Sequence, residues 1–150
     1  MPRPVQQPHP PILVGGTGER VLLRIVAEHA DIWNNLGVAH RDVPRKLEVL
    51  RRHCDAAKRD FAAIEISQQT LAAIATRPDD ARRATEGVRT SLPFLSGGDD
   101  LIIAGTPDEC IERIERSAAM GITSLIMSFG RAVDLDALEL FAQKVLPAFR

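Results

Sequence analysis

The sequence predicts an α/β fold in which about four parallel strands form a sheet covered by amphipathic helices. Four short apolar runs have the length and composition of buried strands, and they lie near residues 12–15, 31–33, 64–67 and 123–128. The segments between them repeat apolar residues at helical spacing and begin with capping residues. Strands that alternate with helices over short links form right-handed β-α-β units, which make neighbouring strands parallel.

The first strand is predicted at Ile12–Val14, after a proline-rich leader over residues 1–10 that is expected to be extended. A glycine-rich turn, Gly15–Gly18, separates this strand from a helix predicted over Glu19–Ala30. A second short strand over Ala30–Trp33 follows directly. Glycines let backbone approach a ligand closely, and the free N–H groups at a helix start attract anions. The motif is compatible with a plain tight turn and with a phosphate site.

A second helix is predicted over Asp42–Ala57, with Asp42 as its N-cap and Pro44 in its first turn. Its core-facing stripe consists of Val43, Leu47, Leu50 and Cys54. The side chains interpreted as its solvated face are Arg45, Lys46, Arg51 and Arg52.

A third strand is predicted within Ala63–Thr70, with polar residues at its carboxyl end: Ser67, Gln68 and Gln69. Residues 78–90 suit a helix. The segment Ser91–Ala104 is predicted to be a loop with one short apolar element.

Thr106 marks the clearest helix start in the chain. Thr106 is predicted as the N-cap, Pro107 takes the first helical position, and Glu109 completes a capping box. Gly121 supplies a left-handed stop. The last strand is predicted at Ile122–Phe129. A closing helix from about Leu135 to Ala148 is predicted to bury Leu138, Phe141, Val145 and Leu146.

Composition excludes several classes of function. A net charge of -1 argues against general affinity for nucleic acid or anionic membrane. No apolar run approaches the ~18 residues of a membrane span, and the chain's start has no apolar signal core, so a cytoplasmic location is expected. Cys54 and Cys110 lack metal-ligand spacing and are predicted to be small apolar residues of the core. No metal site is predicted.

Several segments resemble the bacterial luciferase-like family of flavin- and F-420-dependent oxidoreductases. PPILVGG, TGE and ADIWN, within residues 10–34, resemble the central signature of that family. GTPDECIER, AAMGITSL and KVLPAF, within residues 105–149, resemble its C-terminal end and come in the same order. The resemblance implies a TIM-barrel fold, of which residues 1–150 would be a single domain forming the C-terminal half. It also implies that Met1 corresponds to an internal point of the family's chain.

The resemblance further implies a cofactor and a set of residues that hold it. In the family this turn binds the cofactor phosphate, which points to Gly15, Gly16, Thr17 and Gly18, together with Trp33 and Asn34 on the next strand. The TGE turn and the GTPDEC helix look closer to the branch that uses coenzyme F-420, with FMN as the alternative. The implied reaction is hydride transfer between this cofactor and a small organic substrate. Ligands in such barrels sit at the carboxyl ends of the strands.

The family's first four strands hold much of the pocket for the reactive ring, and this chain shows no segment that resembles them. No catalytic residue is therefore assigned, and activity of the chain alone stays open. The alternatives are a non-catalytic half-barrel that binds a phosphate-bearing ligand or a partner chain, and a truncated fragment. Relatives commonly have Gly-Arg-Asp-Pro after the second helix, where this chain has Lys58-Arg59-Asp60-Phe61. A left-handed Lys58 would cost on the order of 1 kcal/mol.

Half of a barrel has two free sheet edges, which a closed barrel does not have. The edges expected here are the strands Ile12–Val14 and Ile122–Phe129, and both are apolar. We therefore expect the isolated chain to form a homo-oligomer or to join a complementing N-terminal half.

Overall fold

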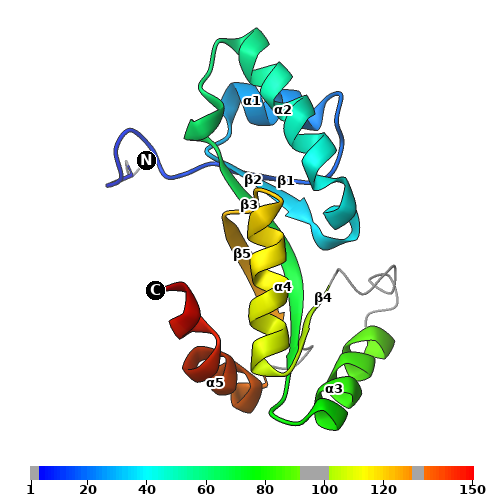
Figure 1. Ribbon diagram of the computed structural model, residues 1–150. Helices are drawn as coiled ribbons and strands as arrows, with labels where there is room; N and C mark the ends of the chain where they lie inside the picture. Colours follow the sequence, from blue (N-terminus) through cyan, green and yellow to red (C-terminus); the bar gives the residue numbers. More distant parts are fainter. Residues whose placement is uncertain (1–3, 92–101, 130–133) are drawn as a thin grey trace.

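The computed structural model describes residues 4–91, 102–129 and 134–150, whose arrangement Figure 1 shows. Its helices and strands follow one another as β1 (Leu13–Gly15), α1 (Leu22–His29), β2 (Ile32–Leu36), the 3-10 helix η1 (Gly37–Asp42), α2 (Val43–Ala57), the 3-10 helix η2 (Phe61–Ala63), β3 (Glu65–Ile74), α3 (Pro78–Ser91), β4 (Ile102–Gly105), α4 (Pro107–Ala119), β5 (Ser124–Phe129), α5 (Leu135–Lys144) and the 3-10 helix η5 (Leu146–Phe149). Each predicted strand and helix is present, with shifts of a few residues at the ends.

The strands form one sheet, and every pairing among the described residues is parallel. β1 pairs with β2, β2 with the first half of β3, and β5 with the opposite side of β3. The order β1-β2-β3-β5 follows the chain, as expected for consecutive strands of a (β/α) barrel. The predicted α/β fold with a parallel sheet is confirmed.

Two predictions about the middle of the chain are wrong. β3 does not end near Gln69 but continues to Ile74, so Ser67 and Gln68 lie inside a strand and are buried. The end of β3 pairs with β4, a fifth strand in a region predicted to be mainly loop. β4 lies beyond the end of β2, on the same side of β3. The intervening residues 92–101 lie outside the described part of the chain.

The helices cover the two faces of the sheet unequally. Alternate residues of a strand point to opposite faces. Trp33 and Ile66 pack on one face with α1 and α2, and Ile74 packs on that same face with α4 and α5. Figure 1 shows α4 lying across β3 and β5. On the other face, α3 covers only the far end, where it packs on Leu71, Ala73, Ile102 and Ala104.

Both cysteines are buried and unpaired, as predicted. Burial raises the pKa of the Cys54 thiol, and it raises the pKa of the Cys110 thiol to about 11. Both thiols are therefore protonated at neutral pH, and neither has the lowered pKa of a reactive cysteine.

The start of α4 confirms the capping box. The Glu109 carboxylate accepts a hydrogen bond from the Thr106 N–H at 2.7 Å, and this bond lowers the pKa of that carboxyl. Gly121 stops the helix with a φ of 98°.

The closing helix α5 differs from expectation. Phe141 and Val145 are buried, but Leu138 and Leu146 are 42% and 39% exposed.

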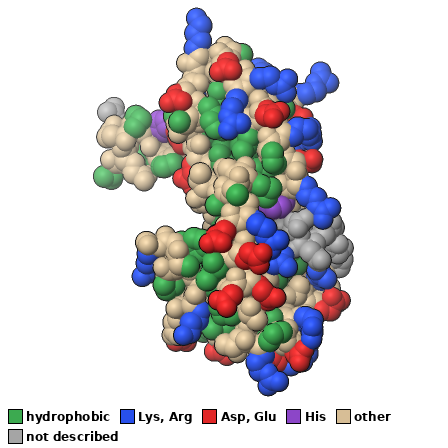
Figure 2. Space-filling model, viewed as in Figure 1, with side chains coloured by type: hydrophobic (Ala, Val, Ile, Leu, Met, Phe, Trp, Pro, Cys, Tyr) green, Lys and Arg blue, Asp and Glu red, His purple; other side chains and the backbone are tan. Residues whose placement is uncertain are grey.

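None of the helices in the described ranges is long and apolar enough to cross a membrane. On the face of the molecule that Figure 2 shows, basic and acidic side chains are interspersed with hydrophobic ones. This mixture of signs agrees with the net charge of -1.

Lys58 ends α2 in the left-handed conformation, with φ 54° and ψ 38°. A side chain in this region is strained, whereas glycine adopts it freely. Lys58→Gly is therefore expected to stabilise the protein by about 0.5–1 kcal/mol, after allowing for the flexibility of glycine in the unfolded chain. Urea unfolding monitored by circular dichroism measures this change. Lys58→Ala is the control, because it removes the long side chain but keeps the Cβ atom. Equal midpoints for the two variants would contradict the strain argument.

Candidate functional site

The glycine-rich turn follows β1 and leads into α1, at the carboxyl end of the sheet. Strand register places Val14 opposite Trp33 and Gly15 opposite Asn34. The six residues predicted to bind the cofactor therefore lie together: Gly15, Gly16, Thr17, Gly18, Trp33 and Asn34.

β2 holds the turn through two hydrogen bonds to Gly16. The Trp33 indole Nε1 donates to the Gly16 carbonyl at 2.9 Å, and the Gly16 N–H donates to the Asn34 carbonyl at 3.0 Å. Trp33 is fully buried on the helix-covered face. The Asn34 side chain accepts from the Ser67 hydroxyl at 2.8 Å and is also buried. Trp33 and Asn34 thus position the backbone of the turn, and their side chains are engaged inside the protein.

The glycines of the turn differ in what the fold requires of them. Gly16 has a φ of 136°, and a Cβ atom there would come within 2.6 Å of Leu22 Cδ1. A Cβ atom at Gly18 would meet its nearest neighbour at an ordinary 3.6 Å, and one at Gly15 at 3.8 Å. Only Gly16 is therefore needed by the fold itself. The missing side chains at Gly15 and Gly18 leave the backbone of the turn open to a close approach from outside.

The start of α1 has no capping side chain and no acidic residue in its first turn. One of its N–H groups, that of Leu23, donates to the Gly18 carbonyl at 3.1 Å. The N–H groups of Thr17 and Gly18 take part in no hydrogen bond among the described residues. Free N–H groups ahead of an uncapped helix are the arrangement that binds phosphate in many proteins.

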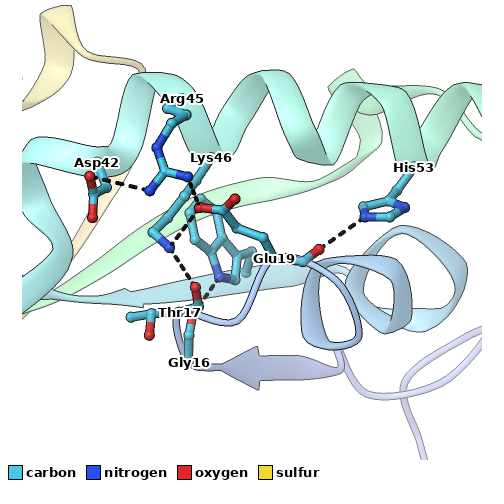
Figure 3. A network of polar contacts seen from close by, with 8 residues as sticks. Gly16, Thr17, Glu19, Asp42, Arg45, Lys46 and His53 are labelled. Carbon is cyan, nitrogen blue, oxygen red and sulfur yellow. Dashed lines mark hydrogen bonds and ion pairs between the residues drawn. The ribbon is translucent and has the colours of Figure 1, made fainter.

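A charged network supports the turn from the side of α2, as Figure 3 shows. The Lys46 ammonium donates to the Thr17 carbonyl and lies 3.4 Å from a carboxylate oxygen of Glu19. Arg45 pairs with the same carboxylate and reaches Asp42 at 3.3 Å. The His53 Nε2 lies 3.0 Å from the Glu19 carbonyl. Glu19 is thereby held among cations of α2.

Lys46 was predicted to lie on a solvated face, and this prediction is wrong. The residue is only 4% exposed. A buried ammonium is costly unless it is paired, and here the Thr17 carbonyl and Glu19 pair it. A signal was present in the sequence, because Lys46 follows Val43 by three residues and therefore borders the buried stripe of α2.

Of the polar residues predicted at the end of the third strand, Ser67 reaches this site through Asn34, whereas Gln68 does not. Gln68 is buried on the helix-covered face, where its Oε1 lies 3.1 Å from both Asn35 Nδ2 and His40 Nδ1. Asn35 Oδ1 and Gln68 Nε2 are buried without a partner. Gly130 and Arg131, which follow the last strand, lie outside the described residues. No group of metal-ligating side chains occurs in the part of the chain that the structure describes.

Comparison with known proteins gives one family match and several fold matches. A family model described as luciferase-like monooxygenase matches residues 1–98. An F420-dependent secondary alcohol dehydrogenase, solved with an F420-acetone adduct, is 15% identical with a TM-score of 0.76, over 96% of this chain and 50% of that chain. A monooxygenase from Streptomyces bottropensis is 22% identical with a TM-score of 0.75, over 100% of this chain and 51% of that one. The coenzyme F420 dependent tetrahydromethanopterin reductase from Methanopyrus kandleri is 19% identical with a TM-score of 0.68, over 93% of this chain and 51% of that chain. At these identities the likeness concerns the fold, and this chain spans about half the length of each structure.

Proposed function

Because this chain belongs to the luciferase-like monooxygenase family, we propose that it binds the phosphate of coenzyme F-420 and serves an oxidoreductase acting on a small organic substrate. FMN is the alternative cofactor. The observation that carries the proposal is the open turn in front of α1, with the free N–H groups of Thr17 and Gly18 and no capping side chain. Two of the solved structures with this fold are F420-dependent enzymes, which supports the choice of F-420.

Each residue of the turn has a separate task in this proposal. The N–H groups of Thr17 and Gly18 donate to phosphate oxygens, and the dipole of α1 favours the negative charge. Lys46 holds the Thr17 carbonyl away from the phosphate, so that the N–H side of the turn faces outward. Trp33 and the Asn34 backbone fix Gly16. Hydride transfer is the chemistry that the bound cofactor would supply. We assign no proton-transfer residue in this chain.

A charge placed in the turn tests the proposal. Gly18→Asp is expected to weaken cofactor binding at least about tenfold, because a carboxylate would face the phosphate. The Gly18 position has room for a side chain, so the fold should persist. Titration of F-420, and separately of FMN, monitored by cofactor fluorescence measures the affinity.

Gly87→Asp is the matched control, since it adds the same charge at an exposed glycine with no atom within 4 Å of the added Cβ. This variant should bind like the unmodified protein. Equal affinities for all three proteins would leave the turn with a structural role only. Binding of the cofactor without reduction of any substrate would favour the alternative, a non-catalytic chain that binds a phosphate-bearing ligand.

A further inference from the structure

Among the described residues, no helix packs on most of one face of the sheet. This bare face consists of the strand residues that point away from α1, α2, α4 and α5: Leu13, Gly15, Ile32, Asn34, Leu36, Glu65, Ser67, Gln69, Ser124, Ile126 and Ser128. Leu13, Leu36 and Ile126 are 45%, 39% and 42% exposed. A sheet normally buries both faces when its strands are parallel. In the part of the chain that the structure describes, Asn34 and Ser67 are buried on this face, and its apolar residues have no covering layer.

The two outer strands also lack neighbours. Among the described residues β1 pairs only with β2, and β5 pairs only with β3. Both outer strands run in the same direction, since every pairing is parallel. Neither strand contains a charged residue or a proline, the features that protect natural sheet edges.

Exposed apolar side chains lie beside each of these two strands. Beside β1 lies a hollow of about 750 Å³. Its apolar lining is Val14, Val21, Leu22 and Ile25, and its polar lining is Thr17, Gly18, Glu19 and Arg20. Val21 is 61% exposed and Ile25 is 39% exposed. On the side of β5, the last helical segments α5 and η5 expose Leu138, Leu146 and Phe149 by 42%, 39% and 44%.

We propose that a second copy of this chain closes the sheet into an eight-stranded parallel barrel, to which each copy contributes β1, β2, β3 and β5. A twofold axis along the strands brings β1 of each copy beside β5 of the other, with the two strands parallel. The bare faces then enclose a common interior, which eight strands leave just wide enough for side chains to fill. α5 of each copy lies beside α1 of the other, so that the exposed leucines of α5 pack against Ile25 of α1 and leave the N–H groups of Thr17 and Gly18 to the phosphate.

Both surfaces of each proposed contact are present on this one chain, and this is why we propose a second copy as the partner. One polypeptide carries an open β1 edge with a hollow and an open β5 edge with protruding leucines. A twofold axis joins each feature to its complement without any other protein, and it pairs the free edges of β1 and β5. The net charge of -1 adds little repulsion between two copies.

Light scattering coupled to size exclusion tests the assembly. The unmodified protein is expected to elute as one species with twice the 16.4 kDa mass of the chain. Ile126→Lys places a charge on the bare face, and Leu138→Lys places one on the α5 flank. Each variant is expected to raise the dissociation constant at least about tenfold, an effect that corresponds to about 1.4 kcal/mol. Both side chains are more than two-fifths exposed in the single chain, so both variants should fold.

Val38→Lys is the matched control, since Val38 is 52% exposed and follows β2, an inner strand of the sheet. It should remain dimeric, and circular dichroism should show native helix content in all variants. The proposal is overturned if the unmodified chain is a monomer at tens of micromolar, or if it forms larger polydisperse assemblies. It is equally overturned if both lysine variants remain dimeric, or if the chain associates only with a different polypeptide. None of these readouts depends on a cofactor, so the proposed function stands or fails separately.

Discussion

Trp33→Ala is expected to lower the free energy of unfolding by about 3–5 kcal/mol, the cost of removing a large aromatic side chain from a packed core. Trp33 is the largest fully buried side chain, and it packs in the cluster that joins α1 and α2 to the sheet. The variant also loses the hydrogen bond to the Gly16 carbonyl. Since domains of this kind are stable by only about 5–15 kcal/mol, the variant should be near the limit of folding.

Urea unfolding monitored by far-ultraviolet circular dichroism measures the loss, because the chain has one tryptophan and the variant removes the fluorescent probe. Protein concentration must be equal in all samples, since dimerisation would add to the apparent stability. Trp33→Phe is the control. It keeps an aromatic ring in the core but removes the indole donor. The free energy of unfolding should therefore fall by less than in the alanine variant, and about 1 kcal/mol of the loss should come from the hydrogen bond. A loss below 1 kcal/mol in the alanine variant would show that the core tolerates the cavity.

Gly16→Ala is expected to destabilise the protein by about 2 kcal/mol, most of it from forcing a side chain into the left-handed region. A further part comes from Leu22, which must move because the new Cβ atom would lie 2.6 Å from its Cδ1. Leu22 packs against the core, so this movement is resisted.

Gly18→Ala, two residues away in the same turn, is the matched control. Its Cβ atom would make only an ordinary contact at 3.6 Å, so its stability should stay within about 0.5 kcal/mol of the unmodified protein. The same urea experiment measures both variants. Equal destabilisation by the two alanines would contradict the distinction between a glycine that the fold needs and one that it does not need.

This distinction also decides where in the turn a charge should be placed. The backbone at Gly16 makes Gly16→Asp a test of folding as well as of binding. Gly18 separates the two effects, and it is therefore the position at which a charge reports on the cofactor.

Helix ends and tight turns could be predicted from the sequence alone, because neighbouring residues fix them. The α4 helix was predicted with its start at Thr106 and its stop at Gly121, because caps and left-handed stops act within a few residues. The same holds for the glycine-rich turn, which lies where a strand meets a helix. Apolar runs predicted four of the five strands, since a strand that lies between packed layers is mostly apolar.

Strand length and side-chain burial could not be predicted in the same way, because they depend on contacts between residues far apart in the sequence. β3 extends to Ile74 because β4, some thirty residues later, pairs with its end. Lys46 is buried because Thr17 and Glu19, almost thirty residues earlier, supply its partners. Leu138 and Leu146 are exposed although their helical spacing predicts burial, because burial needs a neighbouring surface as well as an apolar side chain. Local pattern selects which residues suit a core, and the positions of the other elements decide which of them find one.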